Sequence, residues 1–303
     1  MNETDDRFVT MEDARLLFRN RFVVFMGDSV VRSMYKDFVT LLQQEQLTVN
    51  EVDLRPKGEM KFKGDRLIEG GDLIKEGKTN GIGYHEVRQF QVDYYMIRYY
   101  FITCCHGAYM ESILEDFQRG MPPDIVIMNS SLWDITRYGA MSVKMFEVNI
   151  TRLLDRIKEV LHPACMFIWL TTLFVSSEIR GGFMIPQIAH KKDSIRLDIV
   201  QANWFATMKC KERELDVFDM NFRMRRWQYS EMIKDGVHWT PRGHRIITTY
   251  LCSYIADSFQ EKISANFAYT GQLPAVIIHR DPNVKQYPEE FWKKQIESIR
   301  KLK

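Results

Sequence analysis

The sequence predicts one α/β domain, a doubly wound (flavodoxin-like) three-layer sandwich with a mainly parallel sheet of five strands. Short apolar runs rich in β-branched and aromatic residues alternate with amphipathic helical stretches along the chain. The 303 residues are 45% hydrophobic, which is enough to bury one large core. No internal repeat, low-complexity tract or Pro-rich linker divides the chain, so a single domain is expected.

Each expected strand is a short apolar run, and each of these runs is followed by a helical pattern. The first run ends at Gly27, and the continuous apolar character of the third suits a strand that is buried on both faces. The clearest helix has apolar residues at helical spacing from Phe146 to Leu161 and is closed by Pro163. The expected strands are 22–26, 99–103, 124–128, 166–170 and 215–220, and the expected helices are 30–44, 109–118, 146–161, 193–211 and 241–255.

Two segments do not fit this alternation. Residues 46–92 contain Gly70-Gly71 and Asn80-Gly-Ile-Gly83, which are turn signals, so we expect an insertion with a hairpin that stands outside the sheet. Residues 261–303 are expected to form a tail with one short basic helix that begins near Pro288. The esterase-like domain described below is therefore expected to comprise residues 1–260.

The composition excludes several classes of protein. The 42 basic and 40 acidic residues give a net charge of +2, so the chain has no strong field for nucleic acid or an anionic membrane. The N-terminus lacks a basic region followed by an apolar core, and no apolar run approaches the ~20 residues of a membrane helix. We therefore expect a protein of the cytosol, with the nucleus as an alternative, that contacts no membrane. The five cysteines form no disulfide framework or zinc spacing, and no metal or cofactor is expected.

Ser29 is a candidate nucleophile because of its position between the first strand and the first helix. At such a turn, the hydroxyl of Gly27-Asp28-Ser29 projects from the carboxyl edge of the sheet. The backbone N–H of Ser29 belongs to a helix start, where the helix dipole favours developing negative charge. The alternative is that Ser29 or Asp28 only caps the helix.

A serine hydroxyl needs a base, and Asp235-Gly-Val-His238 can supply one. This loop lies between the fifth strand and the last helix, at the same edge of the sheet. The three-residue spacing lets the carboxylate bind Nδ1–H of the imidazole, which leaves Nε2 to accept the serine proton. An ordinary surface Asp–His pair is the alternative. His244 is the nearest rival base, but it falls within the following helical pattern, which favours a structural role.

Asn129 follows the third expected strand, where its side-chain amide could donate a hydrogen bond to the oxyanion of a tetrahedral intermediate. An Asn that caps the turn is the alternative. The chain order Ser29, Asn129, Asp235, His238 places all four at strand ends on one edge, and this combination favours catalysis.

Eight segments resemble one family, all in order, within a match that runs from about residue 15 to residue 257. They are Phe25-Met-Gly-Asp-Ser29, Val30-Val-Arg32, Tyr35-Lys-Asp37, Tyr84-His-Glu-Val-Arg-Gln-Phe90, Asn129-Ser-Ser-Leu-Trp-Asp-Ile-Thr-Arg-Tyr-Gly139, Gly181-Gly-Phe183, Asp235-Gly-Val-His-Trp239 and His244-Arg245. The chain thus resembles the PC-esterase domain-containing proteins, which are placed in the SGNH (GDSL-type) hydrolase class with plant and fungal acetylation proteins. The resemblance implies a Ser–Asp–His triad at Ser29, Asp235 and His238 and an oxyanion donor at Asn129.

The sequence departs from this family after the second expected strand. SGNH enzymes usually offer a glycine N–H to the oxyanion there, and the near relatives carry an arginine close to that point. This chain has Thr103-Cys-Cys-His-Gly107, so Cys104 replaces the arginine and Gly107 is the candidate donor. A second departure is the C-terminal tail, which is short where relatives continue into Pro-rich segments.

Three functions are compatible with these residues. The leading one is a serine esterase that hydrolyses a small-molecule or glycan ester through a Ser29 acyl-enzyme. The second is O-acyl transfer to a hydroxyl, and the third is an inactive SGNH-fold protein that binds a partner, which the Cys104 departure favours. Four arginines are candidates to bind an acidic or phosphate-bearing substrate, with ion pairing as the alternative for each. They are Arg32, Arg88, Arg98 and Arg137.

Overall fold

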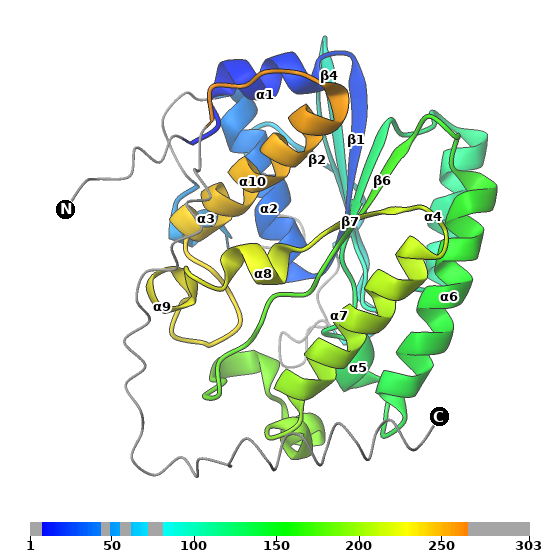
Figure 1. Ribbon diagram of the computed structural model, residues 1–303, viewed down its shortest axis with the longest axis vertical. Helices are drawn as coiled ribbons and strands as arrows, with labels where there is room; N and C mark the ends of the chain where they lie inside the picture. Colours follow the sequence, from blue (N-terminus) through cyan, green and yellow to red (C-terminus); the bar gives the residue numbers. More distant parts are fainter. Residues whose placement is uncertain (1–7, 44–48, 55–61, 72–80, 266–303) are drawn as a thin grey trace, which may run out of the picture. The chain divides into compact units, whose positions relative to one another are not determined.

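A seven-stranded sheet organises the part of the chain that the computed structural model describes, namely residues 8–43, 49–54, 62–71 and 81–265 (Figure 1). The strand order is β2-β3-β4-β1-β5-β6-β7, and the five strands from β4 to β7 are parallel to one another. The strands are β1 (Arg21–Gly27), β2 (Arg66–Gly70), β3 (Glu86–Val92), β4 (Tyr95–Phe101), β5 (Ile125–Met128), β6 (Met166–Leu170) and β7 (Asp216–Phe218).

The five parallel strands are those that the sequence predicts, and the doubly wound α/β fold is confirmed. In chain order their arrangement is second, first, third, fourth, fifth, which is the flavodoxin-like order. The long helices are α1 (Met11–Phe18), α2 (Ser29–Gln43), α4 (Ala108–Arg119), α6 (Ser142–Val160), α7 (Ile195–Lys211) and α10 (Pro241–Phe259). Short helices are α3 (Glu51–Leu54), α5 (Asp134–Arg137), α8 (Met220–Met224) and α9 (Gln228–Glu231), and the 3-10 turns are η1 (Gly181–Phe183) and η2 (Pro186–Lys191).

The prediction that residues 46–92 stand outside the sheet is wrong. β3 pairs antiparallel with all seven residues of β4 across the two-residue connection 93–94, and β2 pairs antiparallel with β3. The sheet therefore has seven strands instead of five. The cause is that Glu86 and Arg88 are buried in β3, where they form ion pairs that composition alone does not reveal. The basic helix expected in the tail lies outside the described residues.

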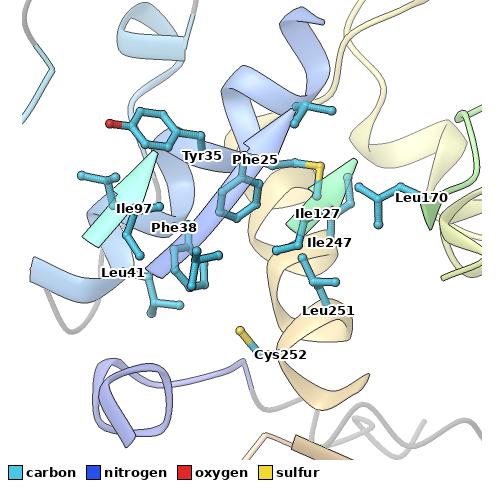
Figure 2. Packing of buried hydrophobic residues seen from close by; sticks show 14 of the residues in the cluster. Phe25, Tyr35, Phe38, Leu41, Ile97, Ile127, Leu170, Ile247, Leu251 and Cys252 are labelled. Carbon is cyan, nitrogen blue, oxygen red and sulfur yellow. The ribbon is translucent and has the colours of Figure 1, made fainter. Parts of the chain in front are cut away.

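Helices cover both faces of the sheet. Helices α1, α2 and α10 lie on one face, and α4, α6 and α7 lie on the other (Figure 1). Successive residues of β1 alternate between the two cores, with Phe25 in the first and Val24 and Met26 in the second. Figure 2 shows Phe25 and Ile127 in the first core, which α10 completes with Ile247 and Leu251. Among the described residues, no helix is apolar enough over a sufficient length to cross a bilayer.

The topology places the candidate site between β1 and β5. These strands are neighbours, with Met26 opposite Met128, but the helices that follow them, α2 and α6, cover opposite faces of the sheet. The chain therefore leaves the two strand ends toward opposite faces of the sheet, and this point of the carboxyl edge is where doubly wound proteins bind ligands. Ser29 follows β1 and Asn129 follows β5 at this point.

Candidate active site

The turn that carries Ser29 is held by close packing and hydrogen bonds. A Cβ atom on Gly27 would lie 2.3 Å from Val31 Cγ2 and 2.8 Å from the Asn129 carbonyl oxygen, so only glycine fits there. Asp28 Oδ1 accepts a hydrogen bond from the Val30 N–H at 2.8 Å and caps the first turn of α2. The Tyr99 hydroxyl lies 3.0 Å from the carbonyl oxygens of both Gly27 and Asp28. These contacts fix the direction in which Ser29 leaves the sheet.

The structure brings Ser29, His238 and Asp235 together in sequence. Ser29 Oγ lies 2.7 Å from His238 Nε2, and His238 Nδ1 lies 2.7 Å from Asp235 Oδ2. Burial raises the pKa of the Asp235 carboxyl, but hydrogen bonds from His238 and Val237 outweigh this and hold the pKa below its ordinary value. An ionised Asp235 keeps the proton of the imidazole on Nδ1, which leaves Nε2 to accept the proton of Ser29.

The loop that carries Asp235 and His238 is braced against residues 176–180. Asp235 Oδ1 accepts the backbone N–H groups of Val237 and His238, each at 2.9 Å, which closes the loop on itself. Gly236 has a φ of +78°, and a Cβ atom there would lie 2.8 Å from the Glu178 carbonyl oxygen. Its own carbonyl oxygen accepts the Ser176 N–H at 2.8 Å, and that of Asp235 accepts the Arg180 N–H at 2.8 Å.

His244, the alternative candidate for the base, is a buried structural residue. It lies in α10 and is 1% exposed. Burial and the nearby His238 lower the pKa of His244 to about 3, so the imidazole is neutral at ordinary pH. No contact with Ser29 joins it to the site among the residues that the structure describes.

Asn129 lies at the predicted edge, but its amide is engaged inside the protein. Nδ2 donates to the Leu170 carbonyl oxygen at 2.8 Å and to Thr172 Oγ1 at 2.9 Å. Both amide hydrogens are thus used, which differs from the expectation that one is aimed at the volume in front of Ser29. These two hydrogen bonds join the end of β5 to the end of β6. Nothing in the sequence around Asn129 indicates Leu170 or Thr172 as its partners. Buried Ser131, two residues on, has a φ of +143°, an unfavourable conformation for a residue other than glycine.

The loop after β4 carries Gly107, the third candidate oxyanion donor, and Cys104. Gly107 precedes α4 and is exposed, and among the described residues no contact joins it to Ser29. Cys104 Sγ lies 3.2 Å from the His106 carbonyl oxygen and accepts from Asn149 of α6 at 3.6 Å. The Cys105 N–H, in the same loop, donates to Asp134 Oδ1 at 2.9 Å.

The four candidate arginines differ in their hydrogen-bond and ion-pair partners. Arg32 and Arg88 are buried and form ion pairs with Glu86, and Arg88 also pairs with Asp65 at 2.8 Å. Arg98 donates to Gln89 Oε1 at 2.6 and 2.8 Å. Arg137 donates to the backbone carbonyl oxygen of Phe183 at 2.5 Å and has no acidic partner among the described residues.

Two supports of the site escape a prediction from the sequence. Tyr99 holds the Ser29 turn, but within an apolar strand it is indistinguishable from a core residue. Residues 176–180 brace the triad loop through backbone hydrogen bonds, which carry no side-chain signature. The segment Gly181-Gly-Phe183 next to them was the available signal, since it belongs to the pattern that resembles a family.

Comparison with known proteins finds close relatives of the sequence. The chain is 37% identical over 249 residues to PC-esterase domain-containing protein 1B of Homo sapiens, covering 82% of this chain and 57% of the relative. It is 36% identical over 249 residues to PC-esterase domain-containing protein 1A of Homo sapiens, covering 82% and 54%. It is also 36% identical over 278 residues to PC-esterase domain-containing protein 1B of Rattus norvegicus, covering 89% and 60%. The chain thus spans less than two thirds of the length of these relatives.

Solved structures with a similar backbone are more distant. A catalytic mutant of Axe2, an acetylxylan esterase from Geobacillus stearothermophilus, is 13% identical with a TM-score of 0.45, covering 78% of this chain and 95% of that chain. A GDSL-like lipase from Bacteroides thetaiotaomicron is 16% identical with a TM-score of 0.44, covering 79% and 89%. No model of a known protein family matches the chain.

Proposed function

This chain belongs to the family of PC-esterase domain-containing proteins, and from that premise we propose that it is a serine ester hydrolase that works through an acyl-enzyme on Ser29. The observation that carries the proposal is the pair of 2.7 Å contacts that link Ser29 Oγ to His238 and His238 to Asp235. A helix cap would require neither contact, and an ordinary surface Asp–His pair would not place Nε2 on the serine hydroxyl.

In the first half of the proposed reaction, His238 Nε2 takes the proton from Ser29 Oγ as the oxygen attacks the ester carbonyl carbon. The carbonyl oxygen becomes an oxyanion. When the tetrahedral intermediate collapses, the bond to the leaving alcohol breaks, and His238 returns the proton to that alcohol. Asp235 stabilises the imidazolium between these two steps.

In the second half, water attacks the acyl group on Ser29, and His238 takes one of its protons. Collapse of the second intermediate breaks the bond to Ser29 Oγ, which regains the proton from His238. The products are a carboxylic acid and the free enzyme. If an alcohol replaces water in this half, the same residues transfer the acyl group, so O-acyl transfer is the second candidate.

The proposed oxyanion hole starts with the backbone N–H of Ser29. Ser29 is the first residue of α2, and the opening N–H groups of a helix have no partner within that helix. Asn129 joins the hole if its N–H turns from Thr172 Oγ1 to the oxyanion, which exchanges one acceptor for another that carries charge. Gly107, in the loop after β4, is exposed and stays the third candidate donor of this hole.

The test is steady-state hydrolysis of a short-chain aryl ester by wild type and by Ser29→Ala. We expect the variant to lose about six orders of magnitude in kcat while its melting temperature stays close to that of wild type. Equal rates for the two proteins would remove the esterase proposal and favour a protein that uses this fold only for binding.

A further inference from the structure

Arg137 is a cation without an acidic partner in the described part of the chain. Its Nη2 donates to the Phe183 carbonyl oxygen, but its Nε and Nη1 are buried and have no hydrogen-bond partner. Burial lowers the pKa of the Arg137 guanidinium, and no neighbouring carboxylate offsets this effect. Unsatisfied buried donors cost stability, so their presence in a native structure calls for a ligand or another explanation.

The nearest acid along the helix does not serve Arg137. Asp134 stands three residues earlier in α5, at a spacing that allows ion pairs. Its Oδ1 instead accepts the Cys105 N–H, and its Oδ2 accepts the Ser130 hydroxyl. The carboxyl group of Asp134 is thus committed to the loop after β4.

Two aromatic rings hold the guanidinium in place. Its Cζ atom lies 5.1 Å from the centre of the Trp133 ring and 5.1 Å from the centre of the Phe183 ring. The Trp133 ring packs edge-on against Phe101, with the ring centres 6.0 Å apart. Because Phe101 pairs with Gly27 in the sheet, this group lies at the edge where Ser29 leaves β1.

The same segment touches both Arg137 and the triad loop. Arg180 donates its N–H to Asp235, and three residues later Phe183 contacts Arg137. Phe183 ends the 3-10 turn η1, in which a Cβ atom on Gly182 would meet nothing within 4 Å. A ligand that binds Nε and Nη1 of Arg137 can leave the hydrogen bond from Nη2 to the Phe183 carbonyl oxygen in place.

We propose that Arg137 binds a carboxylate group of the substrate, so that the site acts on esters that carry a carboxylate away from the bond to be cleaved. This inference rests on the proposed esterase function and narrows its substrate class. A carboxylate satisfies several guanidinium N–H groups at once and supplies the single negative charge that this site lacks.

The experiment compares two pairs of esters that differ in charge. Mono-4-nitrophenyl adipate against 4-nitrophenyl hexanoate places the carboxylate on the acyl side, and 4-acetoxybenzoate against its methyl ester places it on the leaving group. We measure kcat/KM for wild type, Arg137→Gln, Arg137→Lys and the exposed control Arg119→Gln, with melting temperatures as the check on folding.

We expect wild type to prefer the anionic member of at least one pair. Arg137→Gln should lower kcat/KM for that ester by about ten- to a hundredfold, mainly through KM, and leave its neutral partner nearly unchanged. Arg137→Lys should recover part of the loss, and Arg119→Gln should match wild type. The inference is overturned if Arg137→Gln affects both members of each pair equally, or if wild type shows no preference.

A binding titration separates this inference from the proposed function. Calorimetry with 4-acetoxybenzoate and Ser29→Ala, with and without Arg137→Gln, needs no turnover. If Arg137→Gln weakens the binding of 4-acetoxybenzoate but wild type hydrolyses none of the four esters, carboxylate binding by Arg137 stands and the esterase proposal fails. If wild type hydrolyses all four esters and Arg137→Gln changes neither kinetics nor binding, the esterase proposal stands and the inference fails.

Discussion

Gly27 and Val31 approach so closely that a Cβ atom on Gly27 would lie 2.3 Å from Val31 Cγ2. The same atom would lie 2.8 Å from the carbonyl oxygen of Asn129. Gly27 therefore sits at the contact between the first turn of α2 and the end of β5. A side chain there would push these elements apart and move Ser29, which stands two residues away.

Gly27→Ala should accordingly reduce both stability and catalysis. Overpacking a closed site costs about 1–3 kcal/mol, so a clear drop in melting temperature is expected, with a loss of kcat as Ser29 moves away from His238. Gly83→Ala is the matched control, since a Cβ atom at Gly83 meets nothing within 4 Å. A Gly27→Ala protein as stable and active as the control would contradict this account of the turn.

Asp235→Asn should separate geometry from charge. Asparagine keeps an oxygen for the N–H groups of Val237 and His238, but its amide turns the imidazole to the tautomer that cannot accept the Ser29 proton. A loss of about 10⁴ in kcat is expected with little change in melting temperature. Asp257→Asn, at an exposed position of α10, is the control and should keep wild-type kinetics.

Asn129→Ala tests whether the amide serves the oxyanion as well as the fold. Loss of an oxyanion donor lowers kcat by about a hundred- to a thousandfold. Because Nδ2 also donates to the buried Leu170 carbonyl oxygen, we expect a loss of stability of about 1–3 kcal/mol in addition.

Thr172→Val distinguishes the two roles of Asn129. It removes the acceptor Thr172 Oγ1 and leaves the hydrogen bond from Asn129 Nδ2 to the Leu170 carbonyl oxygen in place. If Asn129 donates to the oxyanion, the kcat of Thr172→Val should equal or exceed that of wild type. The kcat of Asn129→Ala should fall to a small fraction of the wild-type value. Full activity of Asn129→Ala would leave the amide with only a structural role.

Lys36 predicts a pH dependence of stability. Its side chain is buried in α2 and donates to the Asp53 carbonyl oxygen at 2.6 Å. Burial, together with the nearby Arg32 charge, lowers the pKa of Lys36 from 10.5 to about 7. Between these values the unfolded chain binds a proton that the folded chain does not, so this residue makes the free energy of unfolding rise with pH.

Thermal melts of wild type and Lys36→Met between pH 7 and 10 measure this effect. The melting temperature of wild type minus that of Lys36→Met should become more positive as the pH rises. Lys158→Met, at an exposed position of α6, should show a constant difference from wild type. A difference for Lys36→Met that is flat or falls with pH would show that Lys36 keeps its proton in the fold.

The parallel strands could be predicted from the sequence because β1, β4, β5 and β6 bury apolar residues on both faces and β7 buries Phe218. β3 could not, because its buried Glu86 and Arg88 are compensated by Arg32 and Asp65, which are distant in the sequence. The charged residues of β3 predict an exposed, polar segment when only the neighbouring sequence is considered. Charged residues can nevertheless be buried in a sheet when they form ion pairs. β2 and β3 join the sheet because β3 pairs with β4 and β2 pairs with β3.

Part of the candidate site could likewise be predicted from the sequence, and part could not. The order and spacing of Ser29, Asp235 and His238 predict their meeting, since strand ends of a parallel sheet share one edge. The engagement of Asn129 depends on Thr172, which is 43 residues away, at the end of another strand. Nothing in the neighbourhood of Asn129 indicates this competitor for its amide.

The central claim is that His238 activates Ser29 as a nucleophile, and covalent labelling by a fluorophosphonate tests it most directly. Intact-mass measurement follows adduct formation in wild type, Ser29→Ala and His238→Gln, with folding checked by thermal melting. The account predicts one adduct on the Ser29 peptide of wild type, none on Ser29→Ala, and much slower labelling of His238→Gln. Labelling of wild type that is no faster than that of folded Ser29→Ala would contradict it.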